Sequence, residues 1–459
     1  MKLPKYIVYI LLAGALFSSC KSGSSNKVAI DNAADSASIE GHPGWIMQGN
    51  IYEVNIRQYT PEGTFKAFEA HLDRLKDMGV QTLWFMPINP ISKLDRKGAL
   101  GSYYAVADFN SINPEYGNMD DWKHLVNAAH EKDFKVIIDW VPNHTGGDHY
   151  WLEKHPDFFM HDSVTGKVIS QFDWTDTRKL DYHNKALVDT MINCMKFWIS
   201  ETGIDGFRCD QAFLVGRGLF WKKCISELKA MKNILMLAES EDSWMHDEGF
   251  DLSYPWKAFH AMVDIAAGTR TPLFLDTVNA FVDATFPANA MLMYFTSNHD
   301  ENSWNKADYG TMPGAVHAPF AVLTQTYARS VPLIYGGQEE PFLDSVSFFY
   351  KDTIHFEKYS RADFYKRLLN LRKNNPALAA DASFRKIHAG DSTQLYAYVR
   401  EKDKSKVLVI LNLSARPAEV NITDASLKGK PRNVFLFNNE DPTAMKWQID
   451  PWGYAVYEY

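Results

Sequence analysis

The chain has 459 residues, 46% of them hydrophobic, so it can bury a large core and exceeds one average domain. Its formal charge is -8, from 48 basic and 56 acidic side chains, which argues against nucleic acid as a partner because phosphate binding favours a basic surface. Aromatic residues make up 14%, and those rings that lie outside the core offer flat apolar faces to a ligand.

Residues 1–20 have the pattern of a signal peptide. Lys2 and Lys5 precede an apolar run, residues 6–17, that is too short to span a bilayer as a permanent helix. Small residues then lead to Cys20 in a pattern that resembles a bacterial lipoprotein processing site, and residues 21–42 are predicted to be a flexible tether. We therefore expect an exported cell-envelope lipoprotein that touches a membrane only through a lipid on Cys20. The alternative is a secreted protein in which Cys20 is incidental.

Strand patterns and helix patterns alternate through the middle of the chain. Residues 65–78 have helical apolar spacing and stop at Gly79, residues 121–130 form a helix capped by Asp120, and residues 186–200 and 220–229 follow the same spacing. The predicted strands are residues 50–55, 80–86, 134–140, 203–210, 234–239, 250–253, 291–300 and 331–336. This alternation predicts an α/β protein, a (β/α)8 TIM barrel built from residues 43–142 and 186–375.

Two stretches depart from this alternation. Residues 143–185 are rich in His, Asp, Gly and aromatic residues, show no clear helix and are too long for an ordinary connection. They are predicted to form a small inserted subdomain after the third strand. Residues 376–459 contain short alternating segments, such as 394–399, 406–413 and 454–459, which predict a C-terminal antiparallel β-sandwich.

Three of the predicted barrel strands end at a carboxylate: Asp210, Glu239 and Asp300. Because the carboxyl ends of barrel strands all face one mouth, these side chains are expected to converge although they are far apart in sequence. Convergent carboxylates are what the cleavage of a glycosidic bond requires. Glu241 competes with Glu239 for a place in this group, but the strand pattern ends at Glu239 and puts Glu241 in the following loop.

Four stretches in order along the chain resemble the signature blocks of the α-amylase family of glycoside hydrolases, family thirteen. They are residues 139–144, residues 206–210, Glu239 after its strand, and residues 297–300. The resemblance extends from about residue 45 to residue 459. It implies a retaining mechanism in which Asp210 is the nucleophile, Glu239 is the general acid/base and Asp300 fixes substrate hydroxyls.

The same resemblance implies that Arg208, His144, His299 and Tyr104 bind the substrate. Arg208 lies two residues before Asp210, on the same face of the predicted strand. Its positive charge is therefore expected to keep the nucleophile ionised and oriented. His144 and His299 would donate or accept hydrogen bonds at hydroxyls of the sugar that is cleaved, and Tyr104 would stack on its ring.

Several other side chains at the predicted mouth are candidates for supporting the site or stacking on the substrate. Asp139 and Asp108 are expected to support the site rather than react, and a loop-capping role is an equal alternative for Asp108. Three tryptophans in loops at the mouth could stack on glucose rings or pack in the core: Trp174, Trp244 and Trp304.

Many members of the family carry a Lys-His pair shortly after the nucleophile, which serves a substrate subsite and a structural calcium ion. Residues 211–215 read Gln-Ala-Phe-Leu-Val here instead. Asn143 matches a calcium-ligand position of the family, but the missing pair argues against a structural Ca²⁺. The chemistry itself requires no cofactor.

The sequence therefore predicts a retaining α-glucan hydrolase that cleaves α-1,4-glucosidic bonds of starch-like polysaccharides or maltooligosaccharides. A transglycosylase stays open, because water and acceptor access at the mouth decide where the covalent intermediate goes, and so does an α-1,6-acting glucosidase. The alternative of a different class is a non-catalytic glucan-binding protein. It is disfavoured, because carboxylates gathered at about 5 Å repel by roughly 3 kcal/mol per pair at an effective dielectric of about 20. The oligomeric state is unknown from the sequence.

Overall fold

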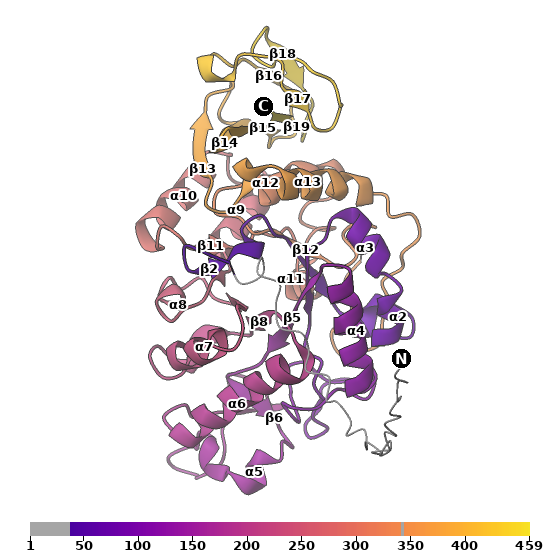
Figure 1. The fold of residues 1–459 in the computed structure, drawn as a ribbon, viewed down its shortest axis with the longest axis vertical. Helices are drawn as coiled ribbons and strands as arrows, with labels where there is room; N and C mark the ends of the chain where they lie inside the picture. The colour runs from indigo at the N-terminus through magenta and orange to yellow at the C-terminus, as the bar shows by residue number, and fades with distance from the viewer. Residues whose placement is uncertain (1–36, 341–343) are drawn as a thin grey trace, which may run out of the picture.

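The computed structural model describes residues 37–340 and 344–459. The predicted signal peptide, Cys20 and the first part of the predicted tether lie outside the described residues. Within the described part, eight parallel strands form one sheet in the order β11-β10-β9-β8-β5-β4-β3-β12. Backbone hydrogen bonds from Val331 to Leu292 (2.9 Å) and from Leu333 to Tyr294 (2.8 Å) join its two ends. The sheet is a closed barrel, which confirms the predicted (β/α)8 fold (Figure 1).

Short strands and longer helices alternate around the barrel. The strands are β3 (Ile51–Val54), β4 (Thr82–Phe85), β5 (Lys135–Trp140), β8 (Gly206–Cys209), β9 (Leu235–Ala238), β10 (Leu252–Ser253), β11 (Met291–Leu292) and β12 (Leu333–Tyr335). The helices are α1 (Ile56–Tyr59), α2 (Phe65–Glu69), α3 (Leu72–Met78), α4 (Met119–Glu131), α6 (Lys185–Thr202), α7 (Trp221–Lys229), α8 (Trp244–Asp247), α9 (Trp256–Ala266), α10 (Phe274–Thr285), α11 (His299–Asn305), α12 (His317–Thr326) and α13 (Ala362–Asn374).

Two of the helix predictions need correction. The helical stretch predicted at residues 65–78 is divided between α2 and α3, although α3 stops at Gly79 as predicted, with a φ of 99°. Helix α4 begins before the predicted residue 121, because Asn118 and not Asp120 is its N-cap. The Asn118 side chain accepts from the backbone of Asp121, and the Asp121 side chain accepts from the backbone of Asn118, which is a capping box.

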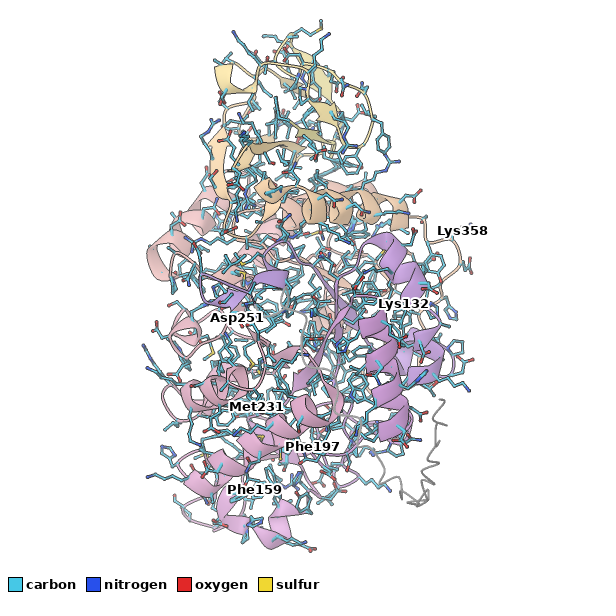
Figure 2. All side chains as sticks on the ribbon, in the orientation of Figure 1. Lys132, Phe159, Phe197, Met231, Asp251 and Lys358 are labelled. Atoms are coloured by element: carbon cyan, nitrogen blue, oxygen red, sulfur yellow. The ribbon has the colours of Figure 1, made fainter. Side chains whose placement is uncertain are left out.

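Alternate side chains of each barrel strand point inward or outward under the helices. Trp84 is in register with Glu53 on one side and with Ile137 on the other, and all three are fully buried. The neighbouring residues Leu83 and Ile138 belong to a different core cluster, which they share with Leu125 of α4 and Leu187 of α6. Side chains fill both layers, so the barrel has a packed core rather than a pore (Figure 2).

Gly206 allows β8 to lie directly against β9. Its φ is +154°, and a Cβ atom at this position would lie 2.1 Å from the carbonyl oxygen of Leu235. A larger residue therefore cannot occupy this position without moving a strand. Asp210 and Glu239 directly follow these two strands, so Gly206 fixes the spacing of the strands that carry both carboxylates.

The seventh barrel strand is shorter than predicted. The sequence pattern predicts a strand that runs to Asp300, but β11 ends at Leu292 and α11 begins at His299. Asn298 caps this helix, since its side chain accepts from the backbone N–H of Glu301 at 2.8 Å. Asp300 therefore projects from the first turn of a helix. Buried apolar residues at 293–295 continue the strand-like pattern without strand geometry.

The long segment after β5 contains a small hairpin, in which β6 (His144–Gly146) pairs antiparallel with β7 (Thr177–Lys179). Helix α5 (Trp151–Lys154) follows β6 and precedes β7 in the sequence. The prediction that this segment contains no clear helix is therefore wrong for these four residues. The segment lies at the end of the molecule away from the C-terminal sheets (Figure 1), near the label of Phe159 in Figure 2.

Two antiparallel sheets follow α13 and confirm the predicted C-terminal sandwich. One has the order β13-β14-β15-β19-β17, and the other pairs β16 with β18. The strands are β13 (Ser383–Ile387), β14 (Leu395–Lys402), β15 (Ser405–Asn412), β16 (Ala418–Val420), β17 (Arg432–Asn433), β18 (Trp447–Ile449) and β19 (Tyr454–Glu458). Val399, Ile410 and Val420 share a buried cluster between the sheets, whereas Tyr398 packs in the same cluster as Leu323 of α12.

The described chain starts with a hairpin of β1 (Ser38–Ile39) and β2 (His42–Pro43). His42 is buried, and its Nδ1 atom lies 2.9 Å from Asp251 Oδ1, so the last residues assigned to the tether are instead held against the barrel. No helix within residues 37–340 and 344–459 combines the length and the apolar content that a membrane span needs.

Candidate active site

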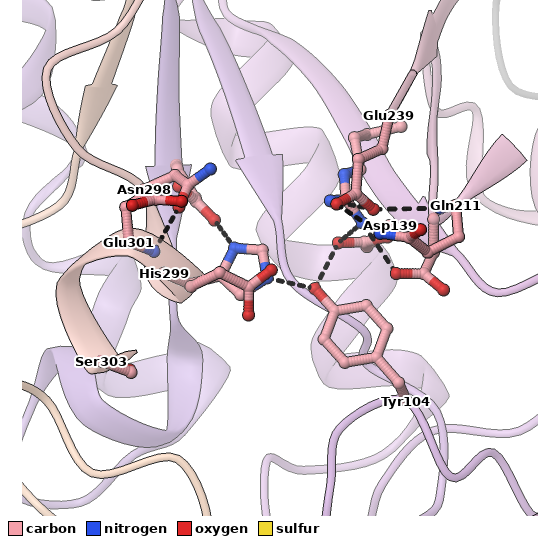
Figure 3. Close-up of polar contacts among 12 residues, drawn as sticks. Tyr104, Asp139, Gln211, Glu239, Asn298, His299, Glu301 and Ser303 are labelled. Carbon is pink, nitrogen blue, oxygen red and sulfur yellow. Dashed lines mark hydrogen bonds and ion pairs between the residues drawn. The ribbon is translucent and has the colours of Figure 1, made fainter. Parts of the chain in front are cut away.

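A single guanidinium group gathers three carboxylates at the carboxyl end of the barrel. Arg208 Nη1 lies 3.0 Å from Asp139 Oδ1 and 3.4 Å from Asp210 Oδ1, and Nη2 lies 2.8 Å from Glu239 Oε2. These residues come from β5, β8 and the ends of β8 and β9, which are neighbours in the sheet. Asp210 and Glu239 therefore lie together as predicted, with Asp139 beside them, whereas the third predicted acid, Asp300, pairs with His299 at 3.3 Å. Glu239 and Asp139 are labelled in Figure 3.

Arg208 lies underneath this group and has no exposed surface. Its guanidinium carbon is 5.0 Å from the centre of the Trp84 ring, and its Nε donates to the hydroxyl of Tyr254 at 3.2 Å. The family resemblance implies that Arg208 binds substrate, whereas in this structure its side chain is fully buried beneath the carboxylates. Its nearest carboxylates are Asp139 and Glu239, whereas Asp210 is the most distant of the three.

The electrostatic environment opposes ionisation of Asp210. Burial raises its pKa well above the usual range and the charge of Glu239 adds to this effect, while Arg208 opposes it. Burial likewise raises the pKa of Asp139 to about 6, again against the charge of Arg208. The guanidinium thus offsets a cost that three gathered carboxylates would otherwise impose on the fold.

A second network runs through His299. Its Nδ1 atom lies 2.5 Å from Glu53 Oε1, and its Nε2 atom lies 2.7 Å from the Tyr104 hydroxyl and 3.3 Å from Asp300 Oδ2. The Tyr104 hydroxyl also donates to Asp139 Oδ2 at 3.1 Å. Tyr104 therefore links the His299 network to the carboxylates around Arg208 (Figure 3).

The charges of His299 and Asp300 each stabilise the ionised form of the other residue. Burial alone would lower the pKa of His299, but the charges of Asp300 and Glu53 and hydrogen bonds to both raise it well above its usual range. Burial raises the pKa of Asp300, yet the charge and hydrogen bond of His299 hold it below its usual value. His299 is therefore an imidazolium at neutral pH, and Asp300 is an ionised carboxylate.

Gln211 holds both oxygens of Glu239. Its backbone N–H donates to Oε2 at 3.0 Å, and its side-chain amide donates to Oε1 at 2.8 Å (Figure 3). Glu241, the competing acid, instead accepts from the backbone and the ammonium group of Lys257, each at 2.8 Å. Of the two acids, only Glu239 lies against Arg208 and next to Asp210.

Two hollows open beside the carboxylates, of about 450 Å³ and about 430 Å³. The first is lined by Asp210, Asp300, Tyr104, His144, Trp174 and Trp304, among others. The second is lined by Glu239, Glu241, Trp256, Lys257 and Phe281, among others. Gln211 lines both. Of the three tryptophans singled out from the sequence, Trp244 does not line either hollow and packs against the core.

A family comparison agrees with this geometry. The family model described as "Alpha amylase, catalytic domain" matches residues 32–360, which is more than half of the chain. The protein belongs to the α-amylase family. It is 26% identical over 400 residues to "Alpha-amylase MalA" of Haloarcula japonica, over 83% of this chain and 57% of that protein.

Solved α-amylase structures have the same fold. The α-amylase from Lactobacillus plantarum superposes with a TM-score of 0.80 and 29% identity, covering 90% of this chain and 99% of that one. A noncanonic maltogenic α-amylase from Thermotoga neapolitana superposes with a TM-score of 0.78 and 26% identity, covering 90% and 96%. The α-amylase family relationship supports glycoside chemistry for this protein, by hydrolysis or by glycosyl transfer.

His144 belongs to the hairpin strand β6 and reaches the first hollow. Its Nε2 atom has no hydrogen-bond partner among the described residues, and its Nδ1 atom lies 3.2 Å from the Asn143 side-chain nitrogen. Burial lowers the pKa of His144 to about 4, so the ring is neutral at pH 7. A neutral ring can donate through one nitrogen and accept through the other.

Asn143 is the calcium-ligand position that the family resemblance implies, and calcium binding there stays a prediction. Ca²⁺ binds six to eight oxygen atoms, commonly with several carboxylates. The Asn143 side-chain nitrogen lies 3.2 Å from His144 Nδ1, and the backbone carbonyl oxygen of Asn143 accepts from the backbone N–H of Leu180 at 3.0 Å. No group of three or more Asp, Glu, His or Cys side chains in residues 37–340 and 344–459 is arranged to hold a metal.

Sequence reasoning missed Glu53 and Gln211 as parts of the site. Glu53 is a lone carboxylate in an otherwise apolar strand, the same signal that marks the other site acids, so it was accessible to the same argument. Gln211 appears in the sequence only as a departure from the usual pattern of the family. Asp108, in contrast, caps its own loop, since it accepts from the Asn110 backbone at 2.9 Å and from the Ser111 hydroxyl at 2.5 Å.

Proposed function

We propose that this protein is a retaining α-glucan hydrolase that cleaves α-1,4-glucosidic bonds of starch-like polysaccharides or maltooligosaccharides. The observation that carries the proposal is the contact of one buried guanidinium with both Asp210 and Glu239. It brings a nucleophile candidate and a proton-donor candidate to one point at the mouth of the barrel. A retaining glycosidase needs this pair close together, with the two carboxylates on either side of the bond that is cleaved.

In the proposed first step, the ionised Asp210 carboxylate, whose charge Arg208 favours against the effect of burial, attacks the anomeric carbon. Glu239 gives its proton to the departing glycosidic oxygen. The carbon–oxygen bond to the leaving sugar breaks, and a glycosyl ester of Asp210 forms. Glu239 then takes a proton from water, whose oxygen attacks the same carbon and releases Asp210. Two displacements leave the configuration of the anomeric carbon unchanged.

The remaining residues bind the sugar in this proposal. The reacting ring would occupy the first hollow, where Tyr104 offers an aromatic face and Asp300 offers an ionised carboxylate to the ring hydroxyls. His144 Nε2, which has no hydrogen-bond partner among the described residues, is available to a further hydroxyl of the same sugar ring. The leaving part of the chain would occupy the second hollow, beside Glu239 and the rings of Trp256 and Phe281.

The proposal is tested by a product profile on starch, pullulan, isomaltose and maltotetraose, with and without a chelator. We expect short maltooligosaccharides from starch and maltotetraose, intact isomaltose, and no effect of the chelator. The Asp210→Asn variant should bind glucan but lose turnover by about 10⁴-fold or more, because an amide cannot form the glycosyl ester. Products longer than the substrate would indicate a transglycosylase, cleavage of isomaltose an α-1,6-acting enzyme, and an inactive wild type a binding protein.

A further inference from the structure

Gln211 has an unusual backbone conformation directly after Asp210. Its φ and ψ are +40° and +46°, in the left-handed region that a non-glycine residue seldom adopts. Non-glycine residues in this region often occur where the surrounding structure enforces a functional geometry. Here the conformation turns both the backbone N–H and the side-chain amide of one residue toward Glu239.

These two bonds account for the hydrogen bonding of Glu239 within the described residues. Arg208 Nη2 also forms an ion pair with Glu239 Oε2, at 2.8 Å. Gln211 also lines both hollows, so it sits beside the point where a bound glucan would pass from one to the other. Its side chain therefore fixes the direction in which Glu239 faces the substrate.

We propose that Gln211 is a positioning residue for the acid/base function of Glu239; the inference rests on the function proposed above. Glu239 must deliver a proton in one step and accept one in the next, and both transfers depend on its distance from the reacting oxygen. A primary amide has an N–H donor and a carbonyl acceptor. Gln211 can donate to the carboxylate, as in this structure, and can accept from the carboxylic acid after its amide rotates.

The test compares kcat/KM on maltotetraose with kcat/KM on an aryl α-maltotrioside that has a dinitrophenol leaving group. Both values report the first, bond-breaking step, but only maltotetraose needs a proton on its leaving oxygen. Gln211→Met keeps the length of the side chain and removes the amide. We expect it to lose about ten- to hundredfold on maltotetraose and less than about threefold on the aryl substrate.

Two further variants separate positioning from folding. Gln211→Asn retains an amide and tolerates the left-handed conformation, but its shorter chain cannot reach Glu239, so we expect the same selective loss. Combining Gln211→Met with Glu239→Gln should add no further loss on either substrate, because Gln211 acts through Glu239.

An equal loss on both substrates in Gln211→Met would overturn the inference and indicate a structural or sugar-binding role. Full activity of Gln211→Asn on maltotetraose, or an additional loss in the double variant, would overturn it as well. The single variant Glu239→Gln tests the proposed function separately. If it loses equally on both substrates, Glu239 is not the acid, and both the assignment and this inference fail.

Discussion

Arg208 shows how one residue can make a cluster of acids tolerable. A fully buried guanidinium without partners would be strongly destabilising, and so would three carboxylates without a cation. Arg208 contacts Asp139, Asp210 and Glu239 and also lies over the Trp84 ring. The arrangement explains why the residue two positions before the nucleophile is an arginine: its planar fork serves more than one carboxylate at a time.

Glu53 is expected to set the charge of His299. In Glu53→Gln the side chain keeps its size but loses its charge, so the pKa of His299 should fall from its raised value. His299 then loses its proton at a lower pH than in the wild type, and above that pH Asp300 lacks the cation that faces it. We predict that kcat/KM falls by about tenfold at pH 8 and remains near the wild-type value at pH 5. A tenfold change corresponds to a shift of about one unit in the pKa of His299.

The measurement is the pH profile of kcat/KM together with the ¹⁵N chemical shifts of the histidine rings. Glu131→Gln, which removes an exposed carboxylate at the end of α4, is the matched control and should leave the profile unchanged. An alkaline limb at the same pH in the wild type and in Glu53→Gln would show that Glu53 does not govern His299.

At the level of elements, β8, the strand that leads to the proposed nucleophile Asp210, is anchored at its other end. Asp205 precedes β8, and its Oδ2 atom lies 2.8 Å from His130 Nε2 and accepts from the Val136 backbone at 2.7 Å. Its Oδ1 atom lies 2.8 Å from Lys232 Nζ. Burial alone would raise the pKa of Asp205, but His130 and Lys232 lower it to about 2.

Asp205→Asn should therefore destabilise the fold in a pH-dependent way. Because the pKa of Asp205 is lower in the folded than in the unfolded chain, its charge stabilises the folded state fully at any pH above the unfolded pKa of about 4. This stabilisation is lost as the pH falls through the folded pKa of about 2. We predict a loss of about 2 kcal/mol in the free energy of unfolding at pH 7 and about 1 kcal/mol at pH 3, measured by urea titration. Asp247→Asn, in an exposed pair with Arg217, is the control and should cost less than about 0.5 kcal/mol. Equal losses at both pH values would contradict this account.

Helices and strands could be predicted from the sequence where the local pattern of apolar residues determines them. The apolar runs before Asp210 and Glu239 are strands, and both acids lie where those strands end. The apolar residues 293–295 predicted a strand that continues to Asp300. Residues 293 and 294 do bond to the neighbouring strands β10 and β12, but α11, which carries Asp300, begins at His299. The partners of Arg208 and the Glu53–His299 pair depend on contacts between distant parts of the chain, which no local pattern encodes.

At the scale of the molecule, the C-terminal sandwich is part of the same body as the barrel. Arg400 of β14 is fully buried and donates to the carbonyl oxygens of Thr326 (2.9 Å) in α12 and Ala379 (2.7 Å) after α13. Tyr398 and Leu323 share one core cluster across this boundary. The barrel thus receives support on the side away from the inserted hairpin, while the hairpin supplies His144 to the active site (Figure 1).

The most direct test of the central claim is to trap the glycosyl ester. Glu239→Gln reacted with an α-maltosyl fluoride should form the ester, since fluoride departs with little need of an acid, and should hydrolyse it slowly because the base is missing. Acid quenching, peptic digestion and mass spectrometry should then find a maltosyl group on the peptide that contains Asp210, and specifically on its carboxyl group. A maltosyl group on another carboxylate, or release of the inverted anomer without any adduct, would contradict the account.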